Sequence, residues 1–325
     1  MRLLVTGGAG YIGGTVAAML VEAGHGVTVL DNLCHSSREQ VPAGVDFVEA
    51  DVADRPRVEA LLRGLEPDAV LHFAALIEAG ESMQKPEIYF RNNSASTLAL
   101  LEAMHATQVT KLVFSSTAAV YGEPATVPIE ETAKLAPTNA YGESKLLVEQ
   151  MLQWFHRIHG FRYASLRYFN VAGALDGRGE AHEPETHLIP IVLDVALGRR
   201  EQILIFGDDY DTPDGTCIRD YIHVVDLASA HILALDALKA RDRIICNLGN
   251  GQGFSVKEVV EAARKVTGHP IPTAVRTRRP GDPARLIASS TRARAELGWN
   301  PQTPEIERIL ASAWEWHQRR YIPRR

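Results

Sequence analysis

The sequence has few of the features that mark secreted, membrane or metal-binding proteins. Only three of its 325 residues are cysteines (Cys34, Cys217 and Cys246), they lie far apart, and none forms a C-x-x-C pair. This predicts a reducing compartment, with no disulfide and no metal site. No apolar run approaches the about 18 residues of a membrane span, and the chain opens on MRLLVTGG without a charged-then-apolar leader. We therefore expect no contact with a membrane, no signal peptide and a cytoplasmic location.

An excess of positive charge is also missing. The chain carries 34 lysines and arginines against 40 aspartates and glutamates, and its formal net charge is −6. A nucleic-acid-binding protein would gather its basic residues into a patch, whereas here they are scattered, so no nucleic-acid partner is expected. The 46% hydrophobic and 23% charged content is ordinary for a globular protein. The length predicts two packed units around one cleft.

Short apolar runs alternate with helical patterns through the first half of the chain. Several of the runs are apolar at consecutive positions, as in strands that are buried on both faces. This order predicts an α/β fold with a Rossmann-type, doubly wound parallel sheet. The predicted strands are Arg2–Val5, Val27–Leu30, Asp46–Glu49, Ala69–Phe73, Lys111–Ser115 and Tyr163–Tyr168, and the predicted helices are Tyr11–Ala23, Arg55–Arg63, Glu87–Thr107 and Tyr141–His159.

The alternation breaks after Asn170, where a loop-like, glycine-rich and charged stretch begins. Beyond it the patterns predict helices near Leu188–Leu197, Ser255–Thr267 and Pro304–Arg319, a strand at Ile203–Phe206, and a helix within residues 223–238 that returns to the sheet. We expect residues 1–170 and about 218–248 to form the Rossmann domain. Residues 171–217 and 249–325 are expected to form a smaller, interleaved substrate lobe.

A glycine-rich turn joins the first strand to the first helix. In LLVTGGAGYIGG, Gly8, Gly10 and Gly13 fit G-x-G-x-x-G, while Gly7, Gly10 and Gly13 fit G-x-x-G-x-x-G. Small residues here let backbone N–H groups and the positive end of a helix approach a pyrophosphate. The next strand ends in Asp31, whose carboxylate would bind both ribose hydroxyls and repel a 2′-phosphate, so NAD is favoured over NADP. The alternative is a structural turn with an N-cap aspartate.

Two further strand ends add to this interpretation. Asp51 follows the third strand and could meet the adenine amino group or serve as an N-cap for the next helix. The fourth strand ends in HFAA at residues 72–75, and the small side chains of Ala74 and Ala75 would let the cofactor lie against the backbone.

A tyrosine and a lysine stand one helical turn apart in YGESK. Tyr141 and Lys145 are at positions i and i+4, so they share one helix face. The ammonium group and a nearby nicotinamide cation would favour the phenolate and lower the tyrosine pKa, which makes Tyr141 a usable acid and base. Thr117 ends the fifth strand, and its hydroxyl could share a hydrogen bond with the sugar oxygen that Tyr141 deprotonates. A strand-end or helix-cap hydroxyl is the plain alternative.

The motifs taken together resemble a known family. TGGAGYIG, the DN at 31–32, HFAA, SSTAAVYG, YGESK, LRYFNVAGA and FGDDYDTPDGTCIRDYIHVVDLA are similar to the extended short-chain dehydrogenase/reductases, and most closely to their UDP-glucose 4-epimerase (UDP-galactose 4-epimerase) branch. The resemblance covers about residues 1 to 318. The early motifs mark only the superfamily, whereas YDTPDGTCIRDYIHV and RRPGD are more specific.

The resemblance implies a reaction and a set of site residues. Tyr141 takes the proton of the sugar 4-hydroxyl while hydride passes from C4 to NAD, the 4-keto sugar turns over, and hydride returns to the other face. Implied cofactor contacts are Gly7, Gly10, Tyr11, Ile12, Gly13, Asp31, Asn32, Ser36, Asp51, Val52, Phe73, Ala74, Ala75, Asn92, Lys145 and Phe169. Implied UDP-hexose contacts are Thr117, Tyr141, Asn170, His187, Leu188, Leu204, Phe206, Arg219, Arg279, Asp282 and Leu286. An ion pair of Arg219 with Asp220 and a core role for Phe206 are the plain alternatives.

Two positions depart from some members of the family. Ile77 stands where some relatives carry a lysine near the cofactor pyrophosphate. Leu286 stands where a bulky residue restricts the enzyme to glucose and galactose and a smaller one admits N-acetyl sugars, so added UDP-GlcNAc/UDP-GalNAc turnover is a hypothesis. The resemblance also implies a homodimer in which the helices near Glu87–Thr107 and Tyr141–His159 pair across a two-fold axis into a four-helix bundle.

Three rival functions share the fold. A nucleotide-sugar 4,6-dehydratase would need an Asp–Glu pair after Thr117, where this chain has Ala118 and Ala119. A 4-epimerase of UDP-pentoses or UDP-uronic acids stays open. A non-catalytic NAD-binding regulatory protein would be expected to lack the Tyr/Lys pair or the arginines that this chain retains.

Overall fold

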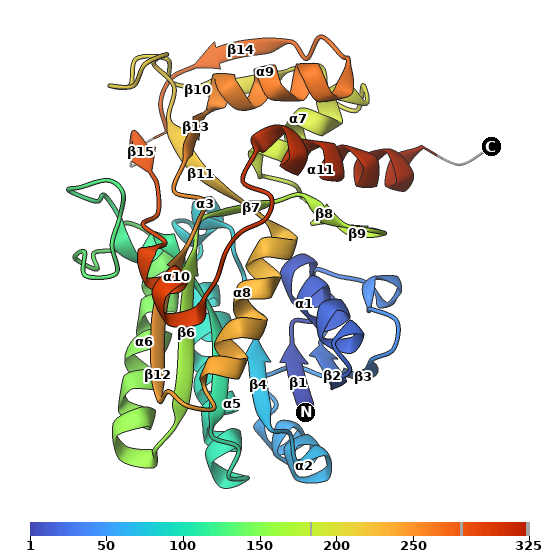
Figure 1. Cartoon of the computed structure of the whole chain (residues 1–325), viewed down its shortest axis with the longest axis vertical. Coiled ribbons are helices and arrows are strands. Elements are labelled where there is room, and N and C mark those ends of the chain that lie inside the picture. Colours follow the sequence, from blue (N-terminus) through green and yellow to red (C-terminus); the bar gives the residue numbers. More distant parts are fainter. Residues whose placement is uncertain (183, 280–281, 323–325) are drawn as a thin grey trace.

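A seven-stranded parallel sheet forms the base of the molecule (Figure 1). The computed structural model describes residues 1–182, 184–279 and 282–322. The order across the sheet is β3-β2-β1-β4-β5-β6-β12, so the chain winds outward from β1 in both directions. This confirms the predicted Rossmann-type α/β fold. The strands are β1 (Arg2–Thr6), β2 (Gly26–Asp31), β3 (Asp46–Glu49), β4 (Ala69–His72), β5 (Lys111–Thr117), β6 (Arg162–Tyr168) and β12 (Arg243–Leu248).

Helices cover both faces of this sheet, which explains the continuous apolar runs. Leu3, Leu4 and Val5 are consecutive in β1 and have no exposed surface. Leu3 and Val5 pack in the core beneath α1 (Tyr11–Glu22) and α8 (Val224–Ala237), whereas Leu4 faces the opposite core. That second core lies under α2 (Arg55–Leu65), α5 (Ser96–Ala106) and α6 (Ala140–His159).

The helix predicted near Glu87–Thr107 is interrupted. It consists of α4 (Pro86–Tyr89), a π-helical stretch over Phe90–Ala95, and then α5. Within the π stretch, the Asn93 side chain accepts a hydrogen bond from the Leu76 N–H (2.8 Å) and donates one to the Leu76 carbonyl (2.9 Å). π-Bulges are frequent at functional sites. Here the bulge ties the helix to the segment that follows β4.

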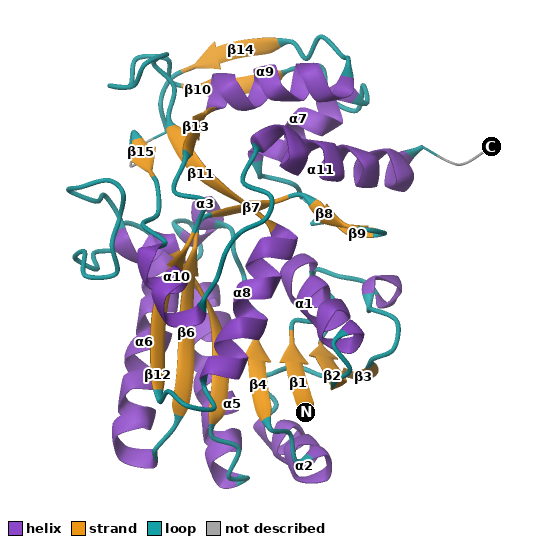
Figure 2. Cartoon of the chain, viewed as in Figure 1, coloured by secondary structure: helices purple, strands orange, loops and turns teal. Residues whose placement is uncertain are grey.

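The second half of the chain builds a lobe over the carboxyl ends of the sheet strands, drawn at the top of Figures 1 and 2. Helices α7 (Leu188–Ala196), α9 (Val256–Thr267) and α11 (Ile306–Tyr321) pack around one core. The lobe contains three groups of strands. In the first, β10 (Ile203–Phe206) pairs with β14 (Thr273–Arg276), and in the second, β11 (Ile218–His223) pairs with each of β7 (Asn170–Ala172), β13 (Gly253–Ser255) and β15 (Arg285–Leu286). The third is a hairpin of β8 (Ala174–Leu175) and β9 (Arg178–Gly179). Short elements complete the fold: α3 (Ala79–Ser82), α10 (Thr291–Leu297), and 3₁₀ turns at Arg38–Gln40 and Ala118–Tyr121.

Each half of the chain contributes segments to the other half's domain. From the second half, β12 forms the edge strand beside β6, and α8 packs against one face of the seven-stranded sheet. Ala293 and Leu297 of α10, and Trp299 after it, join the same core, although they fall within the range 249–325 that the sequence assigns to the lobe. Conversely, β11 lies in the lobe sheet. Across the described residues, no helix combines the length and the apolar character that a bilayer crossing requires.

Candidate active site

The glycine turn after β1 forms a tight cradle at the start of α1. Gly7 has a φ of +72°, and a Cβ added to it would lie 2.5 Å from the backbone nitrogen of Ala74. A Cβ on Gly13 would lie 2.3 Å from the carbonyl oxygen of Gly7. The N-cap of α1 is Gly10, with no capping side chain and no acidic residue in the first turn. Among the described residues, no side chain competes for the first N–H groups of α1, which suits a pyrophosphate.

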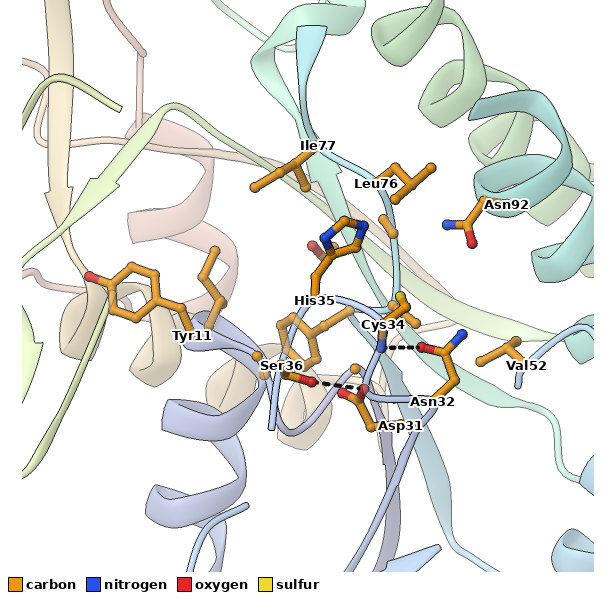
Figure 3. Close-up of a pocket in the computed structure, with 18 of the residues that line it drawn as sticks. Tyr11, Asp31, Asn32, Cys34, His35, Ser36, Val52, Leu76, Ile77 and Asn92 are labelled. Atoms are coloured by element: carbon orange, nitrogen blue, oxygen red, sulfur yellow. Dashed lines mark hydrogen bonds between the residues drawn. The ribbon is translucent and has the colours of Figure 1, made fainter. Parts of the chain in front are cut away.

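Asp31 lies at the end of β2 and faces this cradle. Its carboxylate accepts hydrogen bonds from the N–H groups of Ala9 (3.0 Å) and Leu33 (2.9 Å) and from the Ser36 hydroxyl (3.1 Å). Figure 3 shows Asp31, Asn32 and Ser36 together at the floor of the pocket. Asp31 is the last residue of a strand, and the next helical turn takes Ser37 as its N-cap. The N-cap alternative for Asp31 is therefore wrong.

Asp51 belongs to the same edge. One of its oxygens accepts from the Asn32 amide (2.9 Å) and the other from the Ala53 N–H (2.8 Å). The N-cap of α2 is Asp54, which accepts from the Arg57 N–H. Asp51 does not cap that helix, and the N-cap alternative for this residue is wrong as well.

One cleft runs from the glycine cradle to Tyr141 and contains most of the predicted cofactor residues. It is lined by Gly7, Gly10, Tyr11, Ile12, Gly13, Asp31, Asn32, Ser36, Asp51, Val52, Phe73, Ala74, Ala75, Asn92 and Lys145, as well as by Ile77. Phe169 instead packs beside Val120 and Tyr121. Sequence reasoning missed His35, Glu78, Glu180 and His182, which also line the cleft. The last two come from the other half of the chain, and no local motif marks them.

Tyr141 and Lys145 face the cleft from the first turns of α6. Asn139 caps this helix by accepting the Gly142 N–H (2.8 Å), so the helix begins immediately before Tyr141. The Lys145 side chain is almost fully buried and donates to the Ser115 carbonyl (2.9 Å). The Thr117 hydroxyl, at the end of β5, accepts the Ala119 N–H (3.1 Å) as the cap of the next turn, and it lies near enough to the Tyr141 phenol to affect its pKa. Tyrosine, threonine and lysine therefore meet at one end of the cleft.

Burial controls the acidity of both catalytic candidates. Burial raises the pKa of Tyr141. The neighbouring Thr117 hydroxyl opposes this rise, and the nearby charge of Glu78 raises the pKa further. Burial lowers the pKa of Lys145 to about 7. The expected lowering of the tyrosine pKa by the lysine is therefore not found in the protein alone, where burial dominates. A cationic ring beside the phenol would favour the phenolate, as a nicotinamide does.

Apart from Thr117 and Tyr141, the predicted substrate residues lie on the lobe. Arg219 of β11 forms an ion pair with Asp282, which lies 63 positions further along the chain. The Arg279 guanidinium stacks 4.1 Å from the centre of the Phe206 ring. Asp220 points elsewhere, so the proposed Arg219–Asp220 pair is wrong. Pro280 and Gly281 of the RRPGD motif lie outside the described residues.

The remaining substrate candidates flank these arginines. Leu286 stands opposite Arg219 in the β11–β15 pairing, and the Asn170 amide donates to the Asp220 carbonyl (3.1 Å). His187 is the N-cap of α7 and contacts Glu185 (2.8 Å). Leu188 opens α7, and Leu204 of β10 is 40% exposed. The candidates thus come from β7, α7, β10, β11 and β15 of one lobe.

Known proteins are similar to this chain over nearly its whole length. Residues 3–249 match the model of the NAD dependent epimerase/dehydratase family. A UDP-glucose 4-epimerase of Streptomyces lividans is 56% identical over 97% of this chain and 96% of its own length. A crystal structure of a UDP-glucose 4-epimerase aligns with a TM-score of 0.97 at 49% identity, covering 100% of both chains. The Bifidobacterium longum UDP-glucose 4-epimerase, in complex with NAD+ and UDP, aligns with a TM-score of 0.93 at 41% identity over 99% of each chain. The chain belongs to the NAD dependent epimerase/dehydratase family.

Proposed function

We propose that the chain interconverts UDP-glucose and UDP-galactose by inverting C4 of the sugar, with NAD in the cleft. The observation that carries this proposal is the meeting of Tyr141, Thr117 and Lys145 at the end of a cleft that begins at the glycine cradle. Arg219 and Arg279 stand on the facing lobe, where they suit a diphosphate. Relatives that are similar over nearly the whole chain are named UDP-glucose 4-epimerase, which supports this proposal.

The glycine cradle and Asp31 would hold NAD, whose nicotinamide would supply the hydride chemistry at C4 of the sugar. Tyr141 serves as the base that removes the proton of the 4-hydroxyl, and it gives the proton back when the sugar is reduced. Thr117 holds the reacting oxygen beside the phenol, and Lys145 stabilises the phenolate and positions the nicotinamide ribose. Arg219 and Arg279 hold the diphosphate firmly, so the hexose itself can be held loosely and turn over between the two steps.

Asp31 and the glycine cradle make the cofactor NAD rather than NADP. The Asp31 carboxylate is buried against the Ala9 N–H, so a 2′-phosphate beside it would be repelled. Asp51 and Asn32, which are hydrogen-bonded to each other, border the adenine end of the same cleft.

Assembly, location and domain division complete the proposal. Trp154 and Ile158 of α6 are 61% and 67% exposed, which is costly for such large apolar side chains on a free surface. This supports a homodimer through a four-helix bundle of α5 and α6. We also propose a cytoplasmic location, with residues 1–170 and about 218–248 as the NAD-binding domain and residues 171–217 and 249–325 as the UDP-sugar-binding lobe.

The width of the sugar pocket is a separate part of the proposal. Leu286 is partly buried and packs beside Val120 and Tyr121, so its side chain belongs to a small apolar cluster. This placement supports some turnover of UDP-GlcNAc and UDP-GalNAc in addition to the main substrates. No UDP-GlcNAc conversion at millimolar substrate would remove this part and leave the main activity standing.

The proposed activity is tested by incubating the protein with UDP-galactose, with and without added NAD, and following UDP-glucose. Product without added NAD is the expected result and means that the cofactor is retained through purification. Product only with added NAD would keep the activity and point to Ile77, where the cleft wall carries an apolar side chain. No product under either condition would refute the proposal and direct attention to UDP-pentoses and UDP-uronic acids.

A further inference from the structure

Asp220 is the most tightly enclosed carboxylate near the proposed substrate site. It has no exposed surface, and both of its oxygens accept hydrogen bonds from backbone N–H groups. One oxygen accepts from Asn250 (2.8 Å), and the other accepts from Gly251 (3.0 Å) and Ala288 (3.0 Å). Burial raises the pKa of Asp220 to about 7, although these three bonds act in the opposite direction. One side chain therefore joins three segments that are distant in the sequence.

The enclosure is built for a carboxylate. A Cβ on Gly249 would lie 2.4 Å from the Asp220 oxygen, so only glycine lets the turn at 249–251 come this close. The Asn250 side chain donates to the Tyr221 carbonyl and fastens the same turn to β11. Backbone donors from two loops thus converge on one strand residue.

The joined segments carry the proposed UDP-sugar contacts. Successive strand residues point to opposite faces, so Arg219 faces the lobe surface while Asp220 is buried behind it. Ala288 lies two positions after Leu286, and Leu286 is paired with Arg219 across β11 and β15. Movement of the 286–288 segment would change the distance between Arg219 and Leu286, and with it the fit of the diphosphate and the sugar.

We infer that Asp220 is a positioning residue for the UDP-sugar, because its bonds to Asn250, Gly251 and Ala288 set the spacing between Arg219 and the strand that carries Leu286. The inference rests on the proposed function and deepens it. Asp220 is not among the residues that line the cleft, so it acts through affinity and selectivity.

Asp226 offers a matched control. It is also an almost fully buried aspartate that accepts two backbone N–H groups from a distant segment, those of Gln302 (2.8 Å) and Thr303 (2.9 Å). It lies in α8, away from the proposed substrate contacts. Asp220→Asn and Asp226→Asn each turn an amide NH₂ toward a backbone donor, so both lower stability through the same kind of defect.

The test compares UDP binding by calorimetry, the KM for UDP-galactose, and the ratio of UDP-GlcNAc to UDP-galactose turnover in both variants. We expect Asp220→Asn to weaken UDP binding about tenfold, because Arg219 and the 286–288 segment would lose their fixed spacing, and to change the turnover ratio. Asp226→Asn should keep wild-type UDP binding at an equal loss of stability. Equal UDP binding in the two variants, whether both are intact or both are weakened, would overturn the inference.

A milder variant covers the case in which Asp220→Asn does not fold. Gly251 has a φ of +75°, and a Cβ there would meet only the Ala288 carbonyl at 3.7 Å. Gly251→Ala therefore shifts the turn by strain alone and should weaken UDP binding roughly two- to fivefold. Unchanged UDP binding would refute the positioning role. Wild-type protein that neither binds UDP nor converts UDP-galactose would instead refute the proposed function.

Discussion

The catalytic helix α6 is anchored by a buried ion pair, and breaking that pair should destabilise the protein strongly. Glu149 lies one turn beyond Lys145 on the same face of α6, in the i, i+4, i+8 series that starts at Tyr141. Its carboxylate receives the Arg167 guanidinium through two bonds, of 2.9 and 2.5 Å, and the Ser116 hydroxyl at 2.6 Å. Both charged side chains are at most 3% exposed. The pair therefore joins α6 to β5 and β6 away from solvent.

Glu149→Gln leaves the Arg167 charge buried without a counter-charge. Removing one partner of a buried pair costs about 3–5 kcal/mol, because the remaining ion keeps its desolvation penalty. We expect a loss of this size in the free energy of unfolding, measured by urea denaturation. The double variant Glu149→Leu/Arg167→Met removes both charges and should lose less than Glu149→Gln.

An exposed pair provides the control for this prediction. Lys239 and Asp236 are 57% and 69% exposed, so Asp236→Asn should change the free energy of unfolding by less than about 1 kcal/mol. A loss below about 1 kcal/mol for Glu149→Gln as well would refute the reasoning, since it would mean that Arg167 is not held as a desolvated charge.

Three further predictions follow from particular contacts. In Gly7→Ala the new Cβ would lie 2.5 Å from the Ala74 nitrogen, so this variant should lose about 1–3 kcal/mol in the free energy of unfolding. It should also bind NAD more weakly, which an NAD titration of the folded variant measures. Burial opposes the charged form of His187, but its bond to Glu185 and the nearby acidic charges outweigh burial and raise the pKa of His187 to about 9. Because the folded pKa is raised, the stability difference between wild type and His187→Gln should be largest below about pH 6.5 and should disappear as the pH rises through about 9, which denaturation at several pH values tests. Trp154→Glu should convert a dimer to a monomer in sedimentation without loss of fold, and a variant that sediments like the wild type would contradict the four-helix-bundle proposal.

The sequence predicted the fold well where the pattern is local. The first six strands of the sheet lie within a residue or two of their predicted bounds, because each short apolar run is limited by polar or small residues. Asp31 and the Tyr141–Lys145 pair were found for the same reason. Each is fixed by its position at a strand end or on one helix face.

Non-local features could not be predicted in this way. β12 has a short apolar run, but its place beside β6 depends on the return of α8 to the sheet. The partner of Arg219 is Asp282, 63 positions away, and not its neighbour Asp220. The π stretch over Phe90–Ala95 has no periodicity of its own that differs from the flanking α-helix. Each of these features is decided by tertiary packing.

The central claim is that the Tyr141 phenol moves the proton of the sugar 4-hydroxyl. The most direct test compares wild type and Tyr141→Phe for UDP-glucose formation from UDP-galactose, with NAD and UDP affinities measured on the same samples. The account predicts that Tyr141→Phe loses most turnover, by about 100-fold or more, while both affinities stay near those of the wild type. Wild-type turnover in Tyr141→Phe with both ligands bound would contradict it.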